Sequence, residues 1–266
     1  MQVYSGLPIL TAQPQRPTRL VGVWSLSHTG SVAEYARLAH AAVDQLTAVG
    51  KVAVVTGGTG LYLRAALAEL DLPAAPTPEQ RARWEQVYDR LGPERAYGVL
   101  VGRDPGAAAK LHANDRRRVV RALELTELES SLRPRSDRLW TSETRLPTAI
   151  FGLELPPDVL TLRIERRALE MFEAGVVEEA RAALRQPISA TAVRALGLRE
   201  VAELQPEEAL AALVRRTRRY AAYQRKWMRR IPDLVSVNAD RPAAEIANEI
   251  VEVASARQRL PARRAG

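Results

Sequence analysis

Hydrophobic residues fall into short β-branched runs separated by longer stretches with helical spacing. The run 51–56, KVAVVT, ends in Gly57-Gly58 and predicts a buried parallel strand. The runs 148–155 and 234–238 predict two further strands, and the spacing of leucines predicts a helix over 61–70. Strands separated by helices indicate an α/β fold with a parallel sheet.

The interval between the first two predicted strands has helical rather than sheet-forming patterns. We therefore predict a helical insertion at 73–144, with one helix after a proline-rich linker and another over 115–129. Residues 1–72 and 145–256 then form the α/β core with its C-terminal helices. The basic stretch 257–266 is expected to be a disordered tail.

Composition narrows the class of protein. Hydrophobic residues make up 46% of the 266 residues and aromatic residues only 5%, so the core must be mainly aliphatic. There is no cysteine, which excludes disulfides, thiolate metal sites and a cysteine nucleophile. No apolar run approaches the roughly 18 residues of a membrane span, and the start lacks the basic region of a signal peptide. These features indicate a cytoplasmic protein.

The positive charge is concentrated in one predicted helix. Residues 215–230 hold eight cations and no carboxylate, which equals the net charge of +8 for the whole chain. Such a patch favours a polyanion partner, although a solvated helix face is the alternative. Tyr220, Tyr223 and Trp227 form a stripe among these cations. The stripe is suited either to stacking on bases or to packing in the core.

The sequence Gly57-Gly58-Thr59-Gly60 joins a predicted strand to a predicted helix. Its backbone N–H groups suit an anion at the helix N-terminus, with Thr59 as the N-cap; a tight turn without a ligand is the alternative. It is not a P-loop, which has the pattern GxxxxGK[ST]. None of the three lysines of the chain, Lys51, Lys110 and Lys226, fits that pattern.

Two further arginine groups have alternative interpretations. Arg117 and Arg121 share a helix face and suit an RNA backbone, or else they are held by Glu124 and Glu127. The segment 191–199 places two arginines around a glycine, which suits either a phosphate or a helix C-cap with surface arginines.

Five blocks in order resemble the tRNA dimethylallyltransferase (tRNA isopentenyltransferase) family: MQVYSGL, GGTGLYLRAAL, HANDRRRVVRALE, VRALGLRE and RRTRRYAAYQRKWMRR. The resemblance covers nearly the whole chain. It implies transfer of a dimethylallyl group from dimethylallyl diphosphate to N6 of the adenosine 3′-adjacent to the anticodon of tRNA. It also implies a P-loop NTPase-like core of the ATP-binding type with a helical insertion, Mg²⁺ as cofactor, the tRNA anticodon stem-loop as partner, and a monomer.

The resemblance also assigns residues by position. Arg163 and Arg167 resemble arginines that face the diphosphate, and no residue is assigned as a metal ligand. The positions assigned to tRNA binding are Met1, Gln2, Thr59, Arg81 (with Arg83 the next alignment), Arg194, Arg199, Gln224, Arg225, Lys226, Trp227 and Arg229.

The resemblance begins at a late point in the family pattern. The family's first strand, P-loop and general-base aspartate precede the position of Met1, so no catalytic residue is assigned. We expect a core without that strand and loop, an open sheet edge or apolar surface beside 51–56, and no activity of the chain as written. The leading interpretation is a family member whose start was placed at an internal methionine, so that the chain as written is an incomplete part of an active enzyme. The alternatives are a non-catalytic tRNA-binding remnant and an unrelated basic nucleic-acid-binding protein.

Overall fold

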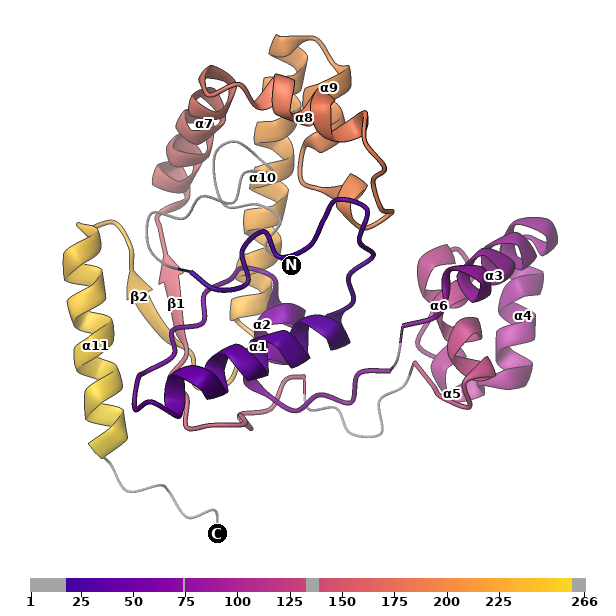
Figure 1. The fold of residues 1–266 in the computed structure, drawn as a ribbon, viewed down its shortest axis with the longest axis horizontal. Coiled ribbons are helices and arrows are strands. Elements are labelled where there is room, and N and C mark those ends of the chain that lie inside the picture. Colours follow the sequence, from indigo (N-terminus) through magenta and orange to yellow (C-terminus); the bar gives the residue numbers. More distant parts are fainter. Residues whose placement is uncertain (1–17, 74, 133–138, 260–266) are drawn as a thin grey trace. The chain divides into compact units, whose positions relative to one another are not determined.

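A computed structural model describes residues 18–73, 75–132 and 139–259. The chain forms two compact units (Figure 1). The first comprises Met1–Glu69 and Leu139–Gly266, and the second, helical unit comprises Leu70–Arg138. The predicted insertion at 73–144 overlaps this helical unit.

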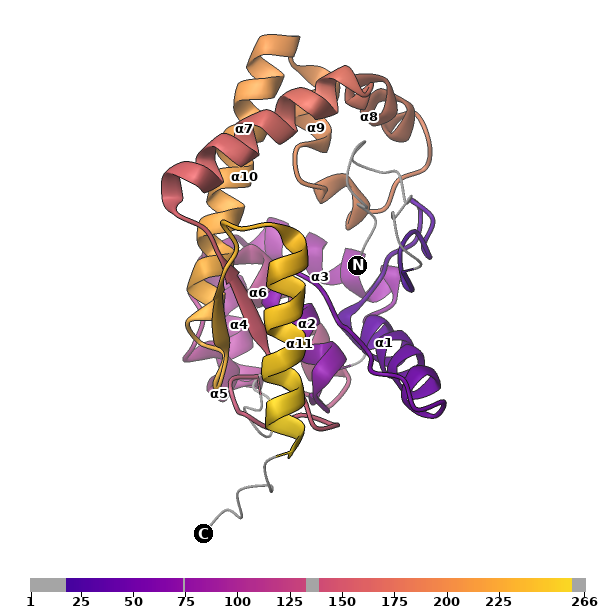
Figure 2. The same cartoon turned by 90° about the vertical axis from the view of Figure 1, so that its left-hand side faces the viewer.

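The first unit contains a two-stranded parallel sheet. Strand β1 (Phe151–Glu154) pairs with β2 (Val235–Asn238), with Phe151 opposite Val235. These pairings confirm two of the predicted strands and the α/β class. Helix α11 (Ala243–Arg259) follows β2 and lies beside the sheet (Figure 2).

The strand predicted at 51–56 is wrong: residues 51–57 belong to neither a helix nor a strand. A strand needs a neighbour that accepts and donates its ladder hydrogen bonds, and the described part of the chain offers this run none. Val52 and Val54 are 74% and 81% exposed. Two apolar side chains of the run are therefore exposed, while the expected open sheet edge is not tested because the run is not part of the sheet.

The disordered tail predicted at 257–266 starts too early, because helix α11 extends into it. Helix α11 continues through Arg259, so residues 257–259 are helical rather than disordered. No glycine or proline interrupts the sequence from 243 to 260, and nothing there stops the helix before Pro261. Residues 260–266 lie outside the described residues.

Helices build the rest of the first unit. They are α1 (Val32–Thr47), α2 (Gly60–Leu67), α7 (Pro157–Glu173), α8 (Val176–Leu184), the 3₁₀ turn η1 (Ala192–Arg194), α9 (Leu198–Glu203) and α10 (Pro206–Met228). Helices α7 to α10 enclose an aliphatic core around Val176, Leu198, Val201 and Leu213, as the low aromatic content predicts.

Helix α10 connects that core to α2. Its first half packs against α7 and α9, and its second half reaches α2 (Figure 1). Ala209, Ala212 and Leu213 are buried in the first half, whereas no residue of the second half is fully buried. Among the described residues, no helix is long and apolar enough to cross a membrane.

The helical unit consists of α3 (Pro78–Leu91), α4 (Pro93–Arg103), α5 (Pro105–Ala108) and α6 (Arg116–Glu127). Thr77 and Gln80 form a capping box at the start of α3, and the Asp115 side chain caps α6. Helices α3, α4 and α6 pack around a core of their own that includes Trp84, Tyr88, Leu100, Val119 and Leu123.

Candidate functional site

The Gly58-Thr59-Gly60 turn is seated on one face of α10. A methyl group at Gly58 would overlap the Gln224 amide, and one at Gly60 would overlap the Trp227 indole. Tyr220, Gln224 and Trp227 are spaced by four and three residues, so they share this face. Glycine is needed at positions 58 and 60 because the backbone comes too close to α10 for a side chain.

Thr59 makes a tertiary contact in place of the predicted helix cap. It occupies the N-cap position of α2, but its side chain accepts no hydrogen bond from the helix. Its Oγ1 instead lies 2.8 Å from the Tyr220 hydroxyl oxygen. The prediction of the N-cap position is right and that of a capping hydroxyl is wrong, because Tyr220 competes for that hydroxyl.

A cluster of aromatic rings and one arginine adjoins this face of α10, formed by Tyr223, Trp227, Trp140 and Arg230. The Trp140 and Trp227 ring centroids are 4.4 Å apart, and the Arg230 guanidinium carbon lies 3.8 Å from the Trp140 centroid. The Tyr223 ring centroid lies 6.3 Å from that of Trp227, and Tyr223 is 53% exposed. The predicted stripe is thus divided: Trp227 packs within the protein, whereas Tyr223 faces solvent.

Arg64 holds the loop that carries Trp140. It is fully buried, and its Nε and one terminal nitrogen each donate a 3.0 Å hydrogen bond, to the carbonyls of Leu139 and Glu143. Burial lowers the pKa of Arg64, and the nearby Glu143 carboxylate opposes that effect. The sequence analysis assigned no role to either Arg64 or Trp140. A lone arginine in the apolar helix LYLRAAL was the only indication of Arg64.

The eight cations of residues 215–230 divide into two groups. Arg216 pairs with Glu200 of α9 and Arg218 with Glu165 of α7, so these two bind α10 to its neighbours. Among the described residues, the others have no carboxylate within ion-pair distance, and all are exposed. These unpaired cations are Arg215, Arg219, Arg225, Lys226, Arg229 and Arg230.

Arg194 and Arg199 are both exposed and flank Gly197. Gly197 has a φ of 82° and precedes α9 as its N-cap, so the predicted helix C-cap at this position is wrong. A side chain at Gly197 would press on Leu213 of α10. The glycine thus serves packing, while the two arginines remain open to a ligand.

Arg163 and Arg167 lie one turn apart on α7, and both are exposed. An Arg163 terminal nitrogen is 3.3 Å from an Asp240 carboxylate oxygen, whereas Arg167 has no such partner among the described residues. Within the part of the chain described here, no hydrogen bond or ion pair joins either arginine to the Gly58–Gly60 turn.

In the helical unit, Arg81 and Arg121 share one buried carboxylate. The Glu124 side chain is 1% exposed; its two oxygens accept from Arg81 Nε and from an Arg121 terminal nitrogen, both at 3.1 Å. Arg83 pairs with Glu127 at a more exposed position. Of the two interpretations of Arg121, the structure supports the one in which carboxylates of the protein hold it.

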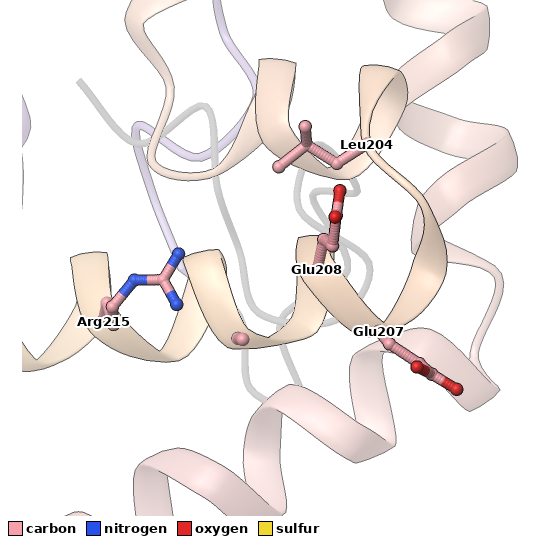
Figure 3. A pocket seen from close by; sticks show the side chains of 5 residues that line it. Leu204, Glu207, Glu208 and Arg215 are labelled. Carbon is pink, nitrogen blue, oxygen red and sulfur yellow. The ribbon is translucent and has the colours of Figure 1, made fainter.

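The implied magnesium has no protein site among the described residues. They contain no group of three histidine, aspartate or glutamate side chains placed to hold a metal ion. One surface depression is lined by Leu204, Glu207, Glu208, Ala211 and Arg215 (Figure 3). It lies on the first turns of α10, whereas the Gly58–Gly60 turn packs on the last turns. Met1 and Gln2 lie outside the described residues.

The comparisons with known proteins agree with this arrangement. Residues 2–231 match the family model described as IPP transferase. The chain is 39% identical to the tRNA dimethylallyltransferase of Thermobifida fusca over 91% of this chain and 79% of the relative. It is 35% identical to that of Corynebacterium jeikeium over 91% and 82%.

Solved structures extend the match to the fold. The full-length tRNA isopentenylpyrophosphate transferase of Bacillus halodurans superposes with a TM-score of 0.60 at 28% identity, covering 92% of this chain and 80% of that one. A eukaryotic dimethylallyltransferase acting on tRNA gives a TM-score of 0.66 at 21% identity, over 92% and 67%. With the family model matched over most of its length, this chain belongs to the IPP transferase family.

Proposed function

We propose that this protein transfers a dimethylallyl group from dimethylallyl diphosphate to N6 of the adenosine 3′-adjacent to the anticodon of tRNA. Relatives that are 35–39% identical over most of the chain are named for this reaction. The observation that carries the proposal is that different faces of α10 contact the Gly58–Gly60 turn and present cations to solvent. One face seats the turn that bears Thr59, and its other faces expose cations without carboxylate partners.

The cations suit the tRNA backbone. Arg225, Lys226 and Arg229 are exposed and have no carboxylate partner among the described residues, so a phosphate can bind them without displacing a carboxylate. Arg194 and Arg199 add two exposed guanidinium groups that suit bidentate contact with phosphate. We assign these five residues to the anticodon stem-loop.

The remaining assignments follow the geometry of each side chain. Thr59 lies in the turn and Gln224 packs against it at Gly58, so both suit contacts with the target nucleotide. Trp227 packs against the turn at Gly60 and supports it. Glu124 binds the Arg81 Nε, and the terminal nitrogens of Arg81, which have no hydrogen-bond partner among the described residues, are assigned to RNA. Arg163 and Arg167 are assigned to the diphosphate of the second substrate, with Asp240 as a competitor for Arg163.

The chemistry is a displacement at an allylic carbon. N6 of the adenosine forms the new N–C bond, the C–O bond to diphosphate breaks, and the electron pair leaves on the diphosphate oxygen. The proton of N6 must pass to a base, which we do not assign to any described residue. The adenosine must leave its stack before it reacts. Fixed donors stabilise the charge that develops on the leaving group.

The described residues do not fit a metal held by the protein alone. Mg²⁺ is commonly bound by substrate phosphates, waters and only one or two carboxylates. We therefore assign the Mg²⁺ of the family resemblance to the diphosphate of the substrate and derive no step through it. We further propose that the protein acts as a monomer in the cytoplasm, where tRNA is found.

The test is the nucleoside content of tRNA in the host organism. Deleting the gene for this chain should abolish dimethylallyl-adenosine in digested tRNA, measured by mass spectrometry. A plasmid carrying the Thermobifida fusca relative should restore it. Unchanged dimethylallyl-adenosine in the deletion strain would overturn the proposal.

A further inference from the structure

The contact between Thr59 and Tyr220 joins residues 161 positions apart in the sequence. A threonine at an N-cap normally uses its hydroxyl to accept a hydrogen bond from the first turn of the helix. Thr59 occupies that position without doing so. The hydroxyl is held by the tertiary structure instead, which forgoes a capping interaction worth about 1 kcal/mol.

The Tyr220 ring is fixed by the helix face that it belongs to. Gln224 and Trp227 of the same face touch the backbone at Gly58 and Gly60, on either side of Thr59. The position of the Tyr220 hydroxyl relative to the turn is therefore set by two neighbouring contacts. A side chain placed in this way fixes the direction of its partner as well as its distance.

The pair keeps unused hydrogen-bonding capacity. A threonine hydroxyl offers one donor and two acceptor positions, and a tyrosine hydroxyl also donates and accepts. Within the described residues, the Thr59 side chain makes no other hydrogen bond than the one to Tyr220. At least one donor hydrogen and one lone pair of the pair remain for a ligand.

We propose that Tyr220 is a positioning residue that orients the Thr59 hydroxyl toward the target nucleotide of the tRNA. The proposal rests on the function proposed above, in which the turn at Thr59 meets that nucleotide. It adds that the contact depends on the Tyr220 hydroxyl, which does not itself touch the RNA base. Tyr220 therefore contributes to recognition of the target adenosine rather than to general affinity for RNA.

The experiment compares two anticodon stem-loop RNAs, one with the target adenosine and one with an abasic residue in its place. Their affinities for the full chain give a discrimination ratio. Tyr220→Phe and Thr59→Val should each lower this ratio by about three- to tenfold, the effect of one lost hydrogen bond. The double variant should lower it no further than either change alone, because both remove the same interaction.

Tyr223→Phe is the matched control. Tyr223 lies on the same helix and its hydroxyl makes no hydrogen bond among the described residues, so the ratio should not change. If Tyr220→Phe weakens both RNAs equally, or leaves the ratio unchanged while Thr59→Val lowers it, the inference fails and the proposed function stands. If the parent itself does not distinguish the two RNAs, the proposed contact with the target nucleotide fails, and the inference fails with it.

Discussion

Arginines play different parts in the helical unit and in the second half of α10. In the helical unit several of them bind carboxylates of the same unit: Arg81 and Arg121 share the buried Glu124, and Arg116 binds both carboxylate oxygens of Asp89. On α10, Arg225 and Arg229 have no carboxylate partner among the described residues. The same residue type thus stabilises one region and leaves the other open to an anion.

The difference lies in what surrounds each guanidinium group. A buried carboxylate such as Glu124 must be paired, and here it is paired with Arg121 of its own helix and Arg81 of α3. Among the described residues, no buried carboxylate lies beside the second half of α10; its inner face meets glycine and aromatic groups instead. Four sets of variants break or sharpen this contrast.

The largest effect is expected on the inner face of α10. Gly60→Ala would push a methyl group into the Trp227 indole, a rigid ring already packed against Trp140. We expect thermal or urea unfolding to show a loss of about 3 kcal/mol, at the upper end for overpacking. Gly58→Ala should cost less because the Gln224 amide can swing away, and Gly57→Ala should cost least because no described atom lies within 4 Å of the added methyl carbon. Equal losses for the three variants would contradict the packing.

The second test removes the shared carboxylate of the helical unit. Glu124→Gln leaves Arg81 and Arg121 without their common counter-charge, and we expect a loss of about 2–3 kcal/mol in the free energy of unfolding. Glu127→Gln is the matched control, since its partner Arg83 is 58% exposed and surface pairs contribute at most about 1 kcal/mol. If the two variants unfold alike, Glu124 does not organise this region.

The third test concerns tRNA binding by α10. Arg225→Ala with Arg229→Ala should remove about two phosphate contacts, which lowers the slope of log affinity against log salt by about 1.4–1.8. Arg216→Ala with Arg218→Ala removes the same charge from the same helix, but those arginines are paired with Glu200 and Glu165. This control should leave the slope nearly unchanged. Identical slopes in the parent and the Arg225/Arg229 variant would mean that these cations do not touch phosphate.

The smallest effect is a pH dependence from an exposed ion pair in the first unit. The hydrogen bond from Arg145 lowers the pKa of Asp44, helped by the charges of Arg145 and His40 and opposed by slight burial. The folded pKa lies below the unfolded one, so this stabilisation is present above about pH 4 and is lost as the pH falls through the folded pKa. Asp44→Asn should flatten the fall of Tm in that acid range.

Asp89 of the helical unit provides the counterpart. Its pKa is lowered mainly by its hydrogen bond with Arg116, so Asp89→Asn should flatten the same acid limb. Because the two pairs share no partner, the effects should add in the double variant. An acid limb in Asp44→Asn that matches the parent would show that this pair does not stabilise the fold.

The sequence alone determined the elements with strong local patterns. The runs 148–155 and 234–238 contain strands β1 and β2, and the helices predicted after the proline-rich linker and over 115–129 correspond to α3 and α6. Five ordered blocks of sequence also sufficed to identify the family. These features depend on neighbours in the chain, through side-chain alternation, helix caps and motif order, so they can be read without coordinates.

Only the tertiary structure decided the parts that depend on distant residues. The run 51–56 has the composition of a strand, but a strand exists only when another lies beside it to complete the ladder. The Thr59 hydroxyl pairs with Tyr220 rather than with its own helix, and Arg64 and Trp140 meet through a loop that no periodicity marks. Which cations of α10 are free follows from where Glu165 and Glu200 lie in space. Spacing along a helix places charges on a face, but only the packing of other elements determines what that face meets.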